Sequence, residues 1–141
     1  MEITLETALL RLVVSLLLGG AIGVERLLGK HPAGFRTFML ICLGSTLATL
    51  ASIYLCQTNM DLHNGDPGRI AAQVLTGIGF IGAGLIIKNQ DGVSGLTTAT
   101  CIFVTAAIGI AVGVGLIWPA VFATVLVLLV LVTSYLTRRK E

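Results

Sequence analysis

The sequence DPGRIAAQVLTGIGFIGAGLII, from Asp66 to Ile87, decides how this chain folds. Its apolar part starts at Ile70 and, as an α-helix rising about 1.5 Å per residue, is about 27 Å long, close to the thickness of the hydrocarbon core of a bilayer. This apolar part also carries four glycines and the amide of Gln73. A helix anchored only in lipid needs none of these residues, so we expect this helix to pack against others on more than one side.

The composition places the chain among membrane proteins. Of its 141 residues 55% are hydrophobic and 11% are charged, whereas soluble domains carry about 25% charged residues. The mean hydropathy is +0.97. We therefore expect the lipid bilayer as its surroundings and no nucleic-acid partner. Cys42, Cys56 and Cys101 lie in or beside apolar runs without CxxC spacing, which favours packing roles over a zinc site or disulfides.

Charged residues divide the chain into five apolar stretches. None occurs between Asp91 and Arg138, and a single helix over that interval would be about 69 Å long, far more than a bilayer spans. Trp118-Pro119 predicts the bend, because proline interrupts a helix and tryptophan favours the membrane interface. The sequence therefore predicts an all-α membrane protein, a single transmembrane domain over residues 1–141 without a soluble C-terminal domain. Its bundle of five transmembrane helices is expected at residues 7–24, 37–56, 70–87, 96–117 and 120–136.

Basic residues in the short loops predict the orientation. The first loop has three between positions 26 and 36, and the C-terminus has three between 138 and 140. The second loop, residues 57–68, has none and carries acids instead. We expect the N-terminus outside and the C-terminus in the cytoplasm. The charged residues of the N-terminal tail before the first span, Glu2 and Glu6, are both acidic, which argues against a cleaved signal peptide.

Small residues recur on the predicted helices, where they let two backbones approach closely in lipid. Ser15, Gly19 and Gly23 are four residues apart, and a similar row runs from Thr97 to Gly113. The third helix has small residues on two faces, which predicts the central helix of the bundle, and the Leu/Val-rich fifth is expected at the periphery. An alternative is that the glycines open a path or let a helix bend. The predicted packing residues are Gly19, Gly23, Gly77, Gly79, Gly82, Gly84, Gly109 and Gly113.

Candidate functional residues at the outer end cluster at the start of the third helix. Asp66 before Pro67 predicts a helix cap. Arg69 opposes the helix dipole in the first turn, so we expect it to pair with Asp66 or another acid. Gln73 lies one turn further and needs a partner at membrane depth. Arg11 near the start of the first helix either snorkels to the surface or joins this polar group.

At the inner end, Glu25 closes the first helix, where an acid is unfavourable. A pair with Arg26 or with Arg36 is the structural explanation. The functional alternative is a cytoplasmic binding site formed by Glu25, Arg26 and Arg36 beneath the first loop.

The remaining polar residues predict little chemistry. Asp61, His63 and Asp66 lack the spacing of a calcium loop, so a solvated loop is favoured and no metal is assigned. The sequence has no Ser/His/Asp set, HExxH or phosphate loop. We therefore expect no enzymatic activity and no cofactor.

Three ordered blocks resemble the MgtC/SapB family of bacterial membrane proteins, also written MgtC/SapB/SrpB/YhiD. The blocks are GGAIGVER at 19–26 with AGFRT at 33–37, DPGRIAAQVLTGIGFIGAG at 66–84, and GLTTA at 95–99 with AAIG at 106–109.

The resemblance covers roughly residues 10–117 and implies a multi-pass bacterial inner (plasma) membrane protein with about five helices. It also implies links to magnesium limitation, acid stress and virulence, and in some members regulation of membrane proteins such as ATP synthase or magnesium pumps. Many members have a Trp where Phe103 stands, and many have a soluble C-terminal domain, so the resemblance is to the transmembrane domain only.

The leading hypothesis is therefore a small, non-enzymatic membrane protein that acts through helix–helix contacts, as a homo-oligomer or as a regulator of a partner membrane protein. The alternative is an ion transporter or channel component for Mg²⁺, suggested by Arg11, Asp66, Arg69 and Gln73. A lipid-binding role is a third possibility.

Overall fold

The computed structural model describes residues 3–58, 66, 68–90 and 92–138. Over these residues the chain forms five helices and one small hairpin. The elements are α1 (Leu5–Leu28), α2 (Phe35–Thr58), α3 (Gly68–Leu85), β1 (Ile87–Asn89), β2 (Gly92–Ser94), α4 (Leu96–Val114) and α5 (Ile117–Arg138). The predicted all-helical class is confirmed. The short antiparallel hairpin, in which Ile87 pairs with Ser94, was not predicted, and Ile87 belongs to it rather than to the third helix.

Within the described residues, four helices are long and apolar enough to cross a membrane: α1, α2 as far as Gln57, α3 and α4. The fifth, α5, is apolar over the shorter stretch Ile117–Thr133. This supports a membrane protein. The number of crossings and the orientation of the termini stay predictions.

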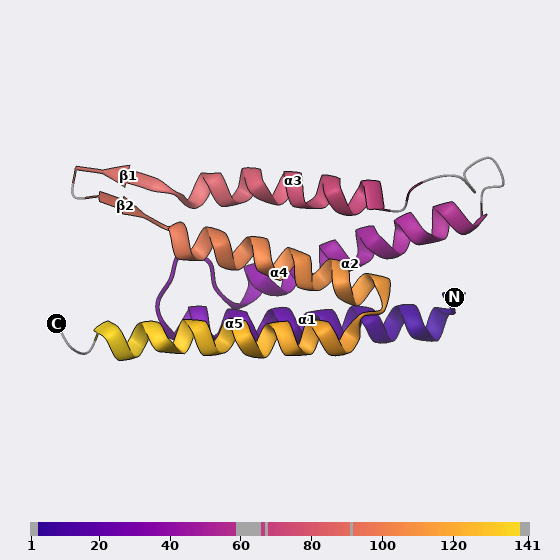
Figure 1. Ribbon diagram of the computed structural model, residues 1–141, viewed down its shortest axis with the longest axis horizontal. Coiled ribbons are helices and arrows are strands. Elements are labelled where there is room, and N and C mark those ends of the chain that lie inside the picture. Colours follow the sequence, from indigo (N-terminus) through magenta and orange to yellow (C-terminus); the bar gives the residue numbers. More distant parts are fainter. Residues whose placement is uncertain (1–2, 59–65, 67, 91, 139–141) are drawn as a thin grey trace.

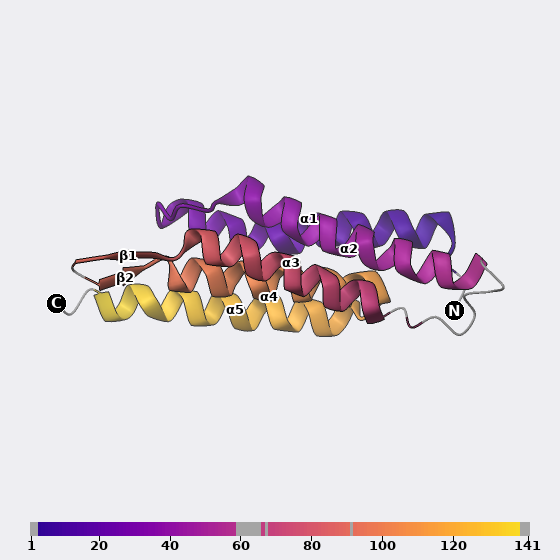
Figure 2. The same ribbon diagram turned by 90° about the horizontal axis from the view of Figure 1, so that it is seen from above.

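The helices lie side by side along one long axis (Figures 1 and 2), with α4 in the middle of the bundle. It contacts all four other helices, and 56% of its span is buried. Only 11% of the α3 span is buried, and its main contacts among the described residues are with α4 and α2. The prediction that the third helix is central is therefore wrong for the single chain. Small residues allow close approach from any side but do not select the neighbour.

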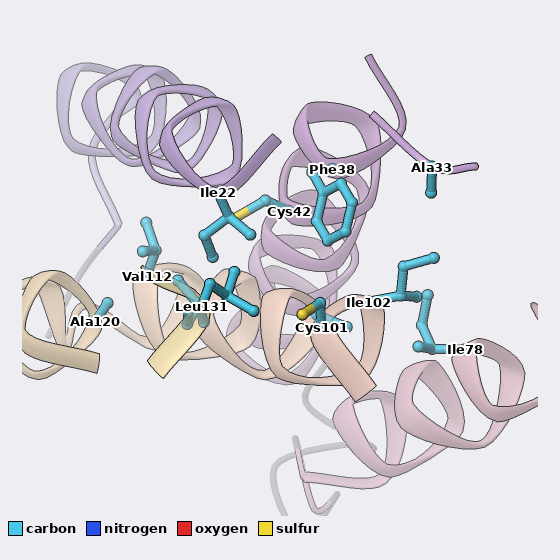
Figure 3. Close-up of a cluster of buried hydrophobic side chains, with 12 residues drawn as sticks. Ile22, Ala33, Phe38, Cys42, Ile78, Cys101, Ile102, Val112, Ala120 and Leu131 are labelled. Carbon is cyan, nitrogen blue, oxygen red and sulfur yellow. The ribbon is translucent and has the colours of Figure 1, made fainter. Parts of the chain in front are cut away.

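The hydrophobic core lies between α1, α2 and α4, where side chains from the three helices converge (Figure 3). Ile22 of α1, Phe38 of α2 and Ile102 of α4 have no exposed surface. The fifth helix packs on α1 and α4 through residues such as Ala120 and Leu131, while much of its remaining surface is exposed.

The turn between α4 and α5 is formed by glycine and not by Trp118-Pro119. The fourth helix ends at Val114, and Gly115 has φ +102°, a conformation that side chains with a Cβ rarely adopt. Pro119 lies in the first turn of α5, where its missing N–H costs little. The fourth helix thus ends at Val114 and not at residue 117, and the fifth begins at Ile117 and not at residue 120.

Candidate functional site

The contact between α1 and α2 is built on the small residues of α1. A Cβ at Gly19 would lie 2.6 Å from the carbonyl oxygen of Phe38, and one at Gly23 would lie 2.7 Å from the Cα of Phe35. Both distances are shorter than real Cβ contacts, so the helices meet backbone to backbone here. Ser15 lies on the same buried row, and its hydroxyl donates to the Leu12 carbonyl within the helix.

The contact between α2 and α4 uses the other predicted row. A Cβ at Gly113 would lie 2.6 Å from the Cβ of Thr49, and one at Gly109 would clash with the Cys42 carbonyl oxygen. The Thr46 hydroxyl donates a 2.7 Å hydrogen bond to the Gly109 carbonyl, which ties the two helices together. The predicted row on α4 is therefore buried from Cys101 to Gly113, whereas Thr97 is exposed.

Three of the four predicted packing glycines of α3 are not packed against another helix in the part of the chain that the structure describes. Gly82 lies at ordinary contact distance from Ala99 of α4. A Cβ at Gly77, Gly79 or Gly84 would have nothing within 4 Å. That these three glycines pack against a helix stays a prediction, and such a helix would have to come from a second chain.

The polar side chains of α3 are exposed as well. Arg69 and Gln73 lie on its open side, and neither side chain has a hydrogen-bond or ion-pair partner among the described residues. The Asp66 carboxylate does not form an ion pair with the Arg69 side chain. It accepts a 2.8 Å hydrogen bond from the Gly68 N–H at the start of α3, in agreement with a capping role.

A groove of about 590 Å³ runs between α2 and α3. Gln73 and Gly77 line it from α3, and Arg36 and Gly44 line it from α2. Its walls are otherwise mostly apolar. The groove therefore continues the open face of α3 onto the neighbouring helix.

Arg11 lies inside the bundle rather than at its surface. It is buried, and its Nη1 donates a 2.8 Å hydrogen bond to the carbonyl oxygen of Gly113 at the end of α4. A cation at a helix C-terminus is favourable because it meets the negative end of the dipole. Arg11 therefore caps the end of α4. Both predicted roles for Arg11, snorkelling to the surface and joining the polar residues of α3, are wrong.

The inner end of α1 holds an ion pair between neighbours. Arg26 is 2% exposed, and its Nη2 lies 2.9 Å from Oε1 of Glu25 while its Nε contacts Oε2. Of the two predicted pairings the structure has Glu25 with Arg26. Arg36 is exposed at the start of α2 and makes no ion pair with Glu25, so the three residues do not form one cluster.

Metal ligation has little support in the part of the chain that the structure describes. No group of three His, Cys, Asp or Glu side chains there could hold a metal ion. Asp61 and His63 lie outside the described residues.

Sequence reasoning missed the hydroxyl row of α2. Ser45, Thr46, Thr49 and Ser52 are all buried, and the first three face the glycines of α4. Their spacing of three and four residues was a visible signal of a small, polar helix face.

Comparison with known proteins places the chain in a family. A profile of the MgtC family matches residues 12–139, and the chain belongs to this family of membrane proteins. No solved structure matches the chain.

Relatives in three bacteria support the assignment. An Escherichia coli K12 protein named "Putative magnesium transporter YhiD" is 46% identical over 125 residues, 87% of this chain and 58% of that protein. An uncharacterised Haemophilus influenzae protein is 41% identical over 92% of this chain and 56% of that protein. Salmonella typhimurium LT2 "Protein MgtC" is 40% identical over 85% of this chain and 49% of that protein. The chain thus spans about half the length of the relatives it matches.

Proposed function

We propose that this chain is a non-enzymatic bacterial inner-membrane protein that acts through helix–helix contacts made by α3, either with a second copy of itself or with a partner membrane protein. We place its N-terminus outside and its C-terminus in the cytoplasm, with α5 as the fifth crossing. The distribution of basic residues supports this orientation.

The observation that carries the proposal is the open face of α3. Gln73, Gly77, Phe80 and Gly84 follow one another at steps of four, three and four residues, so they share one side of the helix. Phe80 is 85% exposed, and both glycines of this row have open space in front of them. Glycine weakens a helix by about 1 kcal/mol relative to alanine, so exposed glycines gain a role only if another helix approaches them.

The amide of Gln73 supports self-association in particular. An amide carries both donors and an acceptor, so two copies of Gln73 can bond each other across a two-fold axis. Such bonds between membrane helices contribute about 0.6–2 kcal/mol each. The glycines beside it allow the close approach that these bonds require.

Cysteine crosslinking in native membranes tests the proposal. In a background with Cys56→Ala, Phe80→Cys on α3 is compared with Phe122→Cys on α5, a second exposed phenylalanine. We expect a crosslinked dimer for Phe80→Cys but not for Phe122→Cys. Adding Gly77→Leu to Phe80→Cys should abolish the crosslink, whereas adding Ala21→Leu on the exposed side of α1 should not.

Two results would contradict the contact role. One is equal crosslinking at both positions, which indicates random collision. The other is no crosslink at either position together with no protein that co-purifies through α3. A partner that co-purifies with the wild type and is lost with Gly77→Leu would favour the regulatory form over the homo-oligomer.

Magnesium transport is the second candidate, and the printed name of the Escherichia coli relative favours it. Arg69 and Gln73 are the exposed polar side chains of α3 that an ion path would use. Mg²⁺ flux into liposomes, measured with wild type and Arg69→Ala, tests this role. Absence of flux in the wild type removes it. For the helix-contact role, we propose a physiological setting in magnesium limitation, acid stress or virulence.

A further inference from the structure

The start of α4 opens into a pocket at the end of the bundle that carries the hairpin and the first loop. The pocket has a volume of about 660 Å³. Ser94, Gly95, Leu96, Thr97 and Thr98 line it from the hairpin and the helix start. His31 and Pro32 line it from the first loop, and Gly84, Leu85, Ile87 and Val93 complete its wall.

Backbone N–H groups at the start of α4 have no cap. The first N–H groups of any helix lack partners within the helix. At α4 the capping position is Gly95, which supplies no side-chain hydrogen bond. The preceding hydroxyl, on Ser94, is 3.3 Å from the carbonyl oxygen of Ile87 and donates to it across the hairpin.

Glycine at this position is enforced by packing. Gly95 has φ +86°, and a Cβ there would clash with the carbonyl oxygen of Leu85 at the end of α3. A Ser, Thr or Asp cap would collide in the same way. Among the described residues, no other element accepts a hydrogen bond from the N–H groups of Leu96, Thr97 or Thr98, so these groups are open to a ligand.

Thr98 gives an independent indication of a ligand. Its side chain is 3% exposed, and its hydroxyl has no hydrogen-bond partner among the described residues. Other helix threonines, such as Thr100 and Thr105, donate to a carbonyl one turn earlier. Every fully buried polar side-chain atom of the described chain has a partner, so the small exposed part of Thr98 includes its hydroxyl oxygen. Thr98 is itself one of the residues that line the pocket.

The chemistry of these groups selects an anion. The positive end of the α4 dipole, the free N–H groups and the Thr98 hydroxyl all favour negatively charged oxygen. None of the described residues that line the pocket is Asp or Glu, and His31 is the ionisable one among them. The His31 backbone N–H is bonded to the Arg26 carbonyl at 3.1 Å, which fixes the first loop over the pocket.

We propose that this pocket binds a phosphate group through the start of α4 and the Thr98 hydroxyl. The phosphate comes either from a phospholipid headgroup or from a free phosphate in solution. The groups that would hold the phosphate belong to α4, although Gly84 belongs both to the wall of this pocket and to the contact row of α3.

The test uses the purified chain in detergent with two probes, inorganic phosphate and short-chain phosphatidylglycerol, and with diacylglycerol as a lipid that lacks phosphate. In wild type we expect at least one of the two phosphate probes to shift the amide resonances of Thr97 and Thr98. The amide resonance of Val121 in α5 should stay unchanged. Diacylglycerol should shift none of them. Thr98→Val should weaken binding about tenfold, the effect of losing one charge-assisted hydrogen bond. Thr105→Val, which removes a hydroxyl of the same helix away from the pocket, should leave binding unchanged.

The probes also identify the source of the phosphate. Shifts with phosphatidylglycerol alone assign a lipid headgroup, and shifts with inorganic phosphate alone or with both assign a free anion or a general phosphate site. Failure of both probes to shift the wild-type amides overturns the proposal, as does equal binding by Thr98→Val and wild type. Because the amide shifts are measured on wild type, the proposal stays testable even if Thr98→Val does not fold.

Discussion

The guanidinium of Arg11 in the first helix donates a 2.8 Å hydrogen bond to the carbonyl oxygen of Gly113 near the end of the fourth helix. This bond joins residues that are 102 positions apart. It places a buried positive charge at the negative end of the α4 dipole. A second arginine nitrogen lies 2.8 Å from where a Cβ of Gly115 would be, so the glycine turn and the arginine cap depend on each other.

Replacing Arg11 with methionine should destabilise the protein by about 2 kcal/mol, because the Gly113 carbonyl loses a charge-assisted hydrogen bond. Thermal unfolding in detergent measures the effect. Arg36→Met, at an exposed arginine, is the control and should have little effect. Equal losses for both variants would show that Arg11 does not stabilise α4.

Alanine at the glycines should have opposite effects according to their neighbours. Gly19→Ala forces a Cβ to within 2.6 Å of the Phe38 carbonyl oxygen and should cost about 1–3 kcal/mol. Gly77→Ala meets open space and should be neutral or stabilise the helix by up to about 1 kcal/mol. Both are measured by unfolding of the monomer in detergent. Destabilisation by Gly77→Ala equal to that by Gly19→Ala would contradict the open position of α3.

Two buried threonines of α2 distinguish bonds between helices from bonds within one helix. Thr46→Val removes the hydrogen bond to the Gly109 carbonyl of α4 and should cost about 0.6–1.7 kcal/mol. Thr49→Val removes a bond to Ser45 of the same helix and should cost less, because the Ser45 carbonyl keeps its place in the helix ladder. The two free energies of unfolding are compared directly. A larger loss for Thr49→Val would contradict the role of Thr46 between the helices.

The Glu25–Arg26 pair should behave as a buried ion pair. Arg26→Met leaves the carboxylate of Glu25 without its partner and should cost about 3 kcal/mol. The double variant Glu25→Gln with Arg26→Met removes both charges and should recover part of the loss. A double-mutant cycle of unfolding free energies measures the coupling. Purely additive losses would show that the two charges do not stabilise each other.

Much of the fold could be predicted because its signals are local. Apolar stretches between charges gave five helices, and the four-residue rows of α1 and α4 identified faces that are buried in the structure. The Asp66 cap was also predictable, since its carboxylate bonds an N–H two residues away. The family resemblance was predictable from three short blocks and is confirmed by the match over residues 12–139.

The partners of Arg11 and Thr46 could not be predicted, because they come from a distant part of the chain. Nothing near Arg11 in the sequence indicates the end of α4. The uncapped start of α4 was hidden as well, because Gly95 is fixed by a contact with the end of α3.

The sequence by itself determined that this is a helical membrane protein, where its helices lie and which of their faces are small. Only the tertiary structure decided which small faces meet. The fourth helix is central: its small row meets the hydroxyl row of α2, and it also contacts α1, α3 and α5. The third helix has equally small faces, yet among the described residues it finds no complementary surface for Gly77, Gly79 or Gly84. Small side chains permit close approach, but a contact forms only where the opposite surface fits.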